Sequence, residues 1–199
     1  MELEPALALS ILLSIALGVG LSAAAGFRVF VPFLVMSAAS LTGHLSLTGG
    51  WSWIGTYPAL VVFAVATVLE VIAYYVPWLD NALDLIATPA AVVAGIVLTA
   101  SVVSDVSPLL RWTLAIIAGG GTAAVVQTGT VLLRGLSSTT TLGFGNFTVS
   151  TAELAGSVLT SVLAVVIPLL ALVLVVILLI WIVRRLRSVR KRLHARKQS

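Results

Sequence analysis

The chain has 199 residues, of which 60% are hydrophobic and 9% are charged, and its mean hydropathy is +1.18. This composition excludes a soluble globular domain, because such domains contain about 25% charged residues. A membrane-crossing helix needs about 20 apolar residues, so the chain has room for about six crossings and for no separate extramembrane domain. We predict an all-α, polytopic integral membrane protein with a single transmembrane domain at 1–183.

The formal net charge of +4 comes from the C-terminal tail. Eight of the eleven Lys and Arg residues lie in 184–199, whereas residues 1–183 carry three Arg and seven carboxylates. Cations beside a membrane helix stay on the cytoplasmic side and attract anionic lipid. We therefore expect a basic cytoplasmic tail at 184–199 that binds anionic lipids, and no nucleic-acid partner.

Apolar segments bounded by Gly, Pro or polar residues predict the helices in chain order: 6–25, 29–47, 59–75, 80–103, 108–135 and 150–183. If each segment crosses once, both termini are cytoplasmic and the polar loop at 137–149 lies outside. The last helix bends at Pro168, because proline removes a backbone donor and clashes with the preceding turn.

Glycines predict helix breaks in two of these regions. Gly26 ends the first helix, and the weakly apolar 29–47 segment that follows is expected to cross, with a re-entrant half-helix as the alternative. Gly119, Gly120 and Gly121 lie in the middle of 108–135. Each glycine costs a helix interior about 1 kcal/mol, so this segment is either broken or closely packed.

A weak internal repeat relates 1–103 to 108–183. A shift of 96 residues places 23–25 on 119–121 and the loop at 49–51 on that at 145–147. Loops on opposite faces are typical of the inverted repeats of transporters; the alternative is that small residues recur for helix packing. Small residues spaced four apart, at Ala91 and Gly95 and again at 152 and 156, also predict a homo-oligomer.

Arg28, Glu70 and Gln127 are the candidate substrate-binding residues, because a charge inside a membrane helix costs about 2.5–3.5 kcal/mol and must be compensated. An Arg beside a helix start can bind a phosphate or carboxylate. A Glu in apolar surroundings can carry a proton. The alternative is that Arg28 and Glu70 pair with each other and lock two helices. Gln127 is placed to bond across helices or to line a path.

Further acids have structural and functional interpretations. Asp80 and Asp84 share one helix face and, with Tyr74, form a candidate outer vestibule; the alternative is that they cap the helix. The Ser150–Glu153 pattern predicts a capping box.

Enzyme signatures are weak in this sequence. It has two histidines, no HExxH pattern and no cysteine, so zinc-hydrolase and thiol chemistry lack their groups. We expect no enzyme, no metal site and no cofactor.

Residues 24–33, AAGFRVFVPF, and 69–84, LEVIAYYVPWLDNALD, resemble an uncharacterised family of small bacterial inner-membrane proteins, a domain of unknown function. The resemblance lies mainly in residues 20–100. It implies a multi-pass protein of the bacterial inner membrane whose shared core contains these polar positions. Where relatives often have an Asp-Lys pair before the proline, this chain has Tyr74 and Tyr75.

Together, these features predict a small transporter or lipid-headgroup translocator that handles an anionic group and is coupled to protons. The alternative is a non-transporting membrane scaffold in which the same polar residues are structural.

Overall fold

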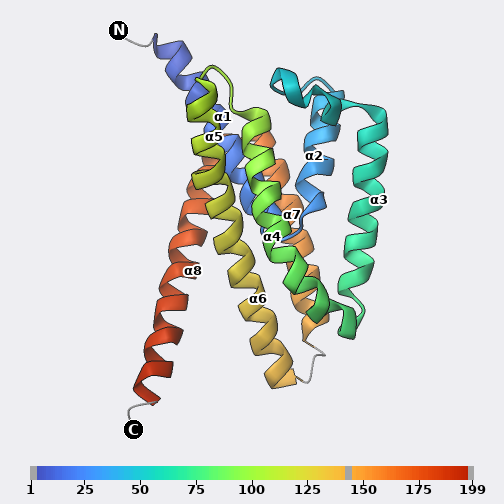
Figure 1. The fold of residues 1–199 in the computed structure, drawn as a ribbon, viewed down its shortest axis with the longest axis vertical. Coiled ribbons are helices and arrows are strands. Elements are labelled where there is room, and N and C mark those ends of the chain that lie inside the picture. The colour runs from blue at the N-terminus through green and yellow to red at the C-terminus, as the bar shows by residue number, and fades with distance from the viewer. Residues whose placement is uncertain (1–3, 142–144, 197–199) are drawn as a thin grey trace.

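The computed structural model describes residues 4–141 and 145–196, and within these residues the fold contains eight α-helices and no strand. A 3₁₀ segment, Gly49–Gly55, precedes α3, and a π-helical turn, Ala115–Gly120, joins α5 to α6. The helices are α1 Pro5–Ala25, α2 Phe30–Leu41, α3 Tyr57–Tyr74, α4 Pro77–Val102, α5 Pro108–Leu114, α6 Gly121–Thr141, α7 Asn146–Val166 and α8 Pro168–Arg196 (Figure 1).

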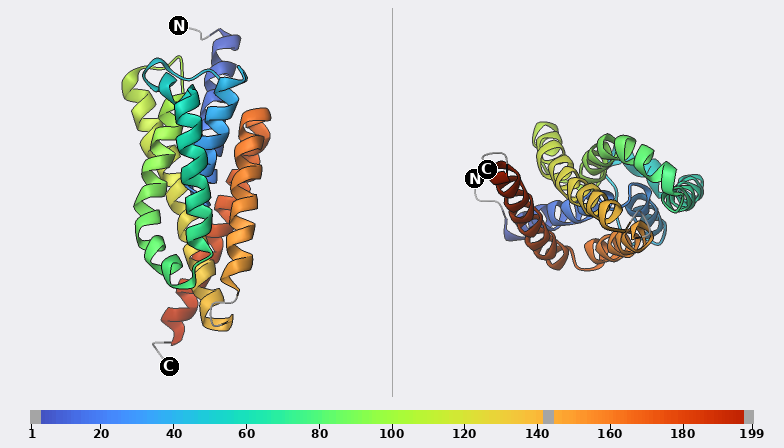
Figure 2. Two further views of the ribbon diagram at one scale, coloured as in Figure 1. Left: turned by 90° about the vertical axis from the view of Figure 1, so that its right-hand side faces the viewer. Right: turned by 90° about the horizontal axis from the view of Figure 1, so that it is seen from below.

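Six segments of the described residues are long and apolar enough to cross a membrane: α1, α3, most of α4, the continuous α5–α6 helix, α7 and the first part of α8. The protein is therefore a multi-pass membrane protein, and the predicted all-α polytopic fold is confirmed. Seen along the bundle, α8 lies at one edge and α1 passes through the middle (Figure 2).

Helices α1 and α2 form a hairpin whose turn lies inside the bundle. α1 enters from the end at which the chain starts, and α2 returns to that same end (Figure 1). The 12 residues of α2 span about 18 Å, which is too short to cross a membrane. The predicted break at Gly26 is confirmed, whereas the expected crossing by 29–47 is wrong and the re-entrant alternative is correct.

The segment predicted as one helix at 150–183 is two helices. Ile167 leaves the helical conformation, with φ −138° and ψ 74°, and Pro168 begins α8. α7 and α8 run in opposite directions, so the end of α6 and the start of α7 lie at the same end of the bundle as the C-terminal part of α8 (Figures 1 and 2). The expectation that the loop at 137–149 faces the side opposite the tail is therefore wrong. Since α1 begins at the other end, the expected common side for both termini is wrong as well.

Close contacts between small residues explain the glycine run in the long α5–α6 helix. A Cβ on Gly119 would lie 2.5 Å from the Gly95 carbonyl oxygen of α4 and would also clash with Thr99. The chain passes this point as a π-helical turn without breaking, so of the two sequence interpretations close packing is correct.

The helix directions do not fit the predicted inverted repeat. α1 and α5, which the repeat would pair, begin at the same end of the bundle (Figure 1), whereas an inverted pair would begin at opposite ends.

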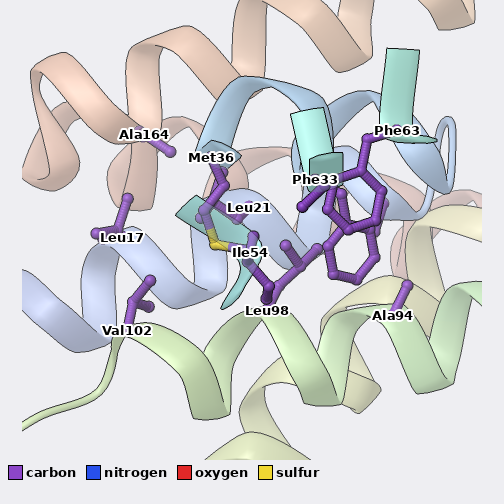
Figure 3. Close-up of a cluster of buried hydrophobic side chains, with 13 residues drawn as sticks. Leu17, Leu21, Phe33, Met36, Ile54, Phe63, Ala94, Leu98, Val102 and Ala164 are labelled. Carbon is purple, nitrogen blue, oxygen red and sulfur yellow. The ribbon is translucent and has the colours of Figure 1, made fainter. Parts of the chain in front are cut away.

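One apolar cluster ties the hairpin to the bundle. Leu21 of α1, Met36 of α2, Leu98 of α4 and Ala164 of α7 are buried together around Ile54 (Figure 3). This packing holds the hairpin against α4 and α7.

The helix directions predict that the two termini lie on opposite sides of the membrane. A reporter placed after residue 199 should be cytoplasmic, because the basic tail resists translocation, and one placed before α1 should be external. Paired fusions of a cytoplasm-active and an export-active reporter measure this directly. Finding both termini on one side would contradict the reversal of direction between α7 and α8.

Gly119→Ala should destabilise the protein, because over-packing a fitted contact costs about 1–3 kcal/mol. Gly121→Ala is the matched control, since a Cβ there meets nothing within 4 Å. Thermal unfolding in detergent should show a lower midpoint for the first variant and an unchanged or higher one for the second. Equal midpoints would contradict the close contact between α4 and the π-helical turn.

Candidate functional site

Arg28 lies in the α1–α2 turn and is only 1% exposed. Its backbone continues the last turn of α1, since the N–H groups of Phe27 and Arg28 both donate to the Ala24 carbonyl oxygen. Its Nη2 donates to the Ser150 carbonyl oxygen at 3.1 Å and lies 3.3 Å from Glu153 Oε2. The turn therefore inserts a guanidinium into the interior, against α7.

Glu153 is a buried carboxylate shared by two arginines. Besides Arg28, it accepts from Arg134 of α6, with Nε at 3.0 Å from Oε1 and with Nη2 at Oε2. The predicted capping box at Ser150 and Glu153 is wrong, because α7 begins at Asn146 and Glu153 lies two turns inside it. Its carboxylate binds arginine side chains from two other elements, which is a role that local sequence spacing does not reveal.

Tyr74, at the end of α3, stacks against both arginines. The guanidinium carbon of Arg28 is 3.9 Å from the ring centroid, and that of Arg134 is 4.1 Å from it. Cation–π attraction is strongest where the cation is desolvated. Tyr74 is 6% exposed and so belongs to this buried cluster, whereas the side chains of Asp80 and Asp84, its expected vestibule partners, lie outside the described residues.

Glu70 binds the start of α2. Its two carboxylate oxygens accept from the N–H groups of Val29, at 2.7 Å, and Phe30, at 3.0 Å. The first N–H groups of a helix have no partner within the helix and attract an anion. The sequence alternative of an Arg28–Glu70 ion pair is thus replaced by two separate contacts on one turn: Glu153 binds the guanidinium and Glu70 binds the backbone.

A stripe of polar side chains extends the cluster along α7 and α6. Every fourth or third residue on the buried face of α7 is polar: Asn146, Ser150, Glu153, Ser157 and Ser161. On α6, Gln127 lies two turns before Arg134 on the same face and is 3% exposed.

Several buried polar atoms in this region have no hydrogen-bond partner among the described residues: Arg28 Nε and Nη1, Gln127 Nε2, Ser150 Oγ and Ser161 Oγ. Three of these atoms are nitrogens that carry N–H groups, so the interior contains hydrogen-bond donors that could bind an acceptor.

Sequence analysis identified Arg28, Glu70 and Gln127 but missed Arg134 and assigned Glu153 to a cap. Two signals were available. Arg134 stands seven residues after Gln127, which places both on one helix face, and Glu153 belongs to the polar stripe of α7.

Glu153→Gln should strongly destabilise the protein, because it leaves two buried guanidinium groups without their counter-charge. Breaking a buried pair on one side costs about 3–5 kcal/mol. Adding Arg134→Gln should recover part of that loss, as expected for coupled residues. Arg185→Gln, on the exposed part of α8, serves as the control. Thermal unfolding in detergent compares these variants with wild type and with the single Arg134→Gln variant, and strictly additive losses would contradict the shared-carboxylate arrangement.

Comparison with known families gives one match and confirms the expected membership of an uncharacterised family. Residues 15–188 match the family described as a domain of unknown function (DUF4126), and this range contains every residue of the buried cluster. Comparison with curated proteins and with solved structures finds no match. The chain is a member of the DUF4126 family.

Proposed function

We propose that the protein is a small membrane transporter or lipid-headgroup translocator that handles an anionic group at Arg28. The observation that carries this proposal is the burial of that guanidinium: it is 1% exposed, yet among the described residues its Nε and Nη1 have no hydrogen-bond partner. Buried donors without partners cost free energy. A guanidinium with unused N–H groups also binds carboxylate and phosphate well.

Unused donors near the cluster support an anionic ligand. Besides the Arg28 nitrogens, Gln127 Nε2 on α6 has no hydrogen-bond partner among the described residues. The two arginines are balanced by two carboxylates, Glu153 on the guanidinium groups and Glu70 on the backbone beside Arg28. A phosphate or carboxylate that displaces Glu70 would restore this charge balance and supply acceptors for the donors.

Glu70 fits the role of a tethered anion. It occupies the N–H groups at the start of α2, which is a site that also suits a free phosphate or carboxylate. Protonation of Glu70, or its displacement by an incoming anion, would release that helix start. If the displaced Glu70 carboxylate takes up a proton, each bound anion is accompanied by one proton, and anion transport is coupled to proton uptake.

The proposal also covers the orientation of the protein, its membrane and its oligomeric state. The end of α3 and the start of α7, which contribute to the cluster, lie toward the end of the bundle that carries the basic part of α8 (Figure 1). We propose that this end is cytoplasmic, that the membrane is a bacterial inner membrane, and that the chain forms a homo-oligomer through small-residue helix faces.

A non-transporting scaffold is the second candidate. The observation that favours it is also the burial of Arg28, since a guanidinium that joins the α1–α2 turn to α7 at 1% exposure stabilises the bundle without any ligand. In that case the ion pair is structural, and the basic tail recruits lipid or a partner.

A flux assay on reconstituted vesicles separates the two functions. The probes are inorganic phosphate, for a soluble anion, and fluorescent phosphatidylglycerol, for a lipid headgroup. Wild-type protein should move one of them faster than protein-free vesicles do. The double variant Arg28→Gln/Glu153→Gln, which removes one charge of each sign, should lose that flux while its thermal stability falls less than that of Glu153→Gln alone, because one arginine rather than two loses the Glu153 carboxylate.

Arg185→Gln is the matched cation control for this assay and should keep wild-type flux. Flux of phosphate alone identifies a solute transporter, and flux of the lipid alone identifies a translocator. Wild-type protein that is folded but moves neither probe would overturn the transport proposal in favour of the scaffold.

A further inference from the structure

A groove of about 570 Å³ lies on the outside of the bundle, between α8 and the chain around the start of α6. Its α6 side includes Ala118, Gly121 and Val125, and its α8 side includes Leu179 and Val183. A Cβ on Gly121 would meet nothing within 4 Å, so the absence of a side chain there keeps the groove open. No residue of the Arg28 cluster lines it, so this groove is separate from the proposed transport site.

The groove is apolar along its length and basic at one end. Ile117 and Ile180, which also line it, are 70% and 48% exposed, as expected for side chains that face lipid. Arg184 and Arg187 lie on the α8 side and are both exposed. They are three residues apart and thus on one face of the helix, whereas Arg185, between them, does not line the groove.

The depth of the two arginines matches that of lipid headgroups. The uncharged apolar run of α8 extends from Pro168 to Val183, and Arg184 is the first cation after it. Arg184 therefore stands where the hydrocarbon ends and phosphate groups begin, and Arg187 stands one turn beyond it. The groove thus presents apolar walls at acyl-chain depth and two guanidinium groups at phosphate depth.

We propose that this groove binds one anionic phospholipid, with an acyl chain along the Gly121 floor and its phosphate between Arg184 and Arg187. Charge complementarity selects this occupant, because two cations at the groove end favour a headgroup with a net negative charge over a zwitterionic one. The proposal assigns the lipid to a defined site rather than to the basic tail as a whole.

The test is lipid binding to the full-length protein, purified in detergent and titrated with phosphatidylglycerol or phosphatidylcholine under intact-complex mass spectrometry. Wild-type protein should bind one phosphatidylglycerol more tightly than any further lipid and more tightly than phosphatidylcholine. Arg184→Gln/Arg187→Gln should weaken that first phosphatidylglycerol roughly 30-fold, given the contribution of two cations near an anionic headgroup.

Two matched controls make the result specific. Arg185→Gln removes a neighbouring cation that does not line the groove and should leave the first lipid unchanged. Gly121→Leu fills the floor and should weaken lipid binding, whereas Gly135→Leu, at another open position on α6 outside the groove, should not.

Three results would overturn the proposal. One is an equal loss of lipid in Arg185→Gln and in a single Arg184→Gln variant, which would mean unspecific attraction to the tail. Another is equal binding of phosphatidylcholine and phosphatidylglycerol. The third is that the wild-type protein is a dimer and that Gly121→Leu dissociates this dimer but leaves lipid binding unchanged. That result would assign the groove to a second copy of the chain.

Discussion

Glu153 places a carboxylate in the interior of a membrane protein, and the arrangement of the helices around it follows from the need to compensate that charge. A charge at this depth is tolerated only with partners. Arg28 and Arg134 supply them from the α1–α2 turn and from α6, and Tyr74 of α3 provides the aromatic face against which both cations rest. The buried turn creates a second requirement, because backbone N–H groups inside a bilayer must also be satisfied. Glu70 meets it at the start of α2. Two carboxylates thus stabilise one turn through different groups.

Small residues allow a polar turn to sit inside the bundle. A Cβ on Gly26 would lie 2.6 Å from a Val126 side-chain carbon, and one on Gly20 would lie 2.7 Å from that of Ala164, so α1 approaches α6 and α7 as closely as backbones permit. At this distance hydroxyl groups reach carbonyl oxygens of the neighbouring helix: Ser157 Oγ donates to the Ala24 carbonyl oxygen at 2.9 Å. In a membrane such packing and interhelical hydrogen bonds replace the hydrophobic effect as the force that holds helices together. Arg28 is therefore held in place by its helix as well as by its ion pair.

Composition and periodicity predicted the fold class and most helices, because the length of an apolar segment is a direct consequence of bilayer thickness. They failed at Pro168, since a proline within an apolar run is compatible with a bend and with a full reversal, and only the packing of α8 beside α1 decides between them. They also identified Arg28 and Glu70, since a charge in an apolar segment is visible in one dimension. The partners were not visible: the pairing of Arg28 with Glu153 joins residues 125 positions apart, and the spacing of Ser150 and Glu153 fits a helix cap equally well until the helix is found to begin at Asn146.

The two carboxylates at the turn are not equivalent, and the difference determines which of them an incoming anion would displace. Glu153 is 5% exposed and binds two guanidinium groups, so removing it would leave two buried cations unpaired, at a cost of several kcal/mol. Glu70 is half-buried and binds two neutral N–H groups at a helix start; charge-assisted bonds of this kind contribute about 1.5–3 kcal/mol each and are open to replacement by another anion of similar geometry. In the proposed function, exchange therefore begins at the contact between α3 and the start of α2, while the Glu153 cluster stays intact and fixes the position of Arg28.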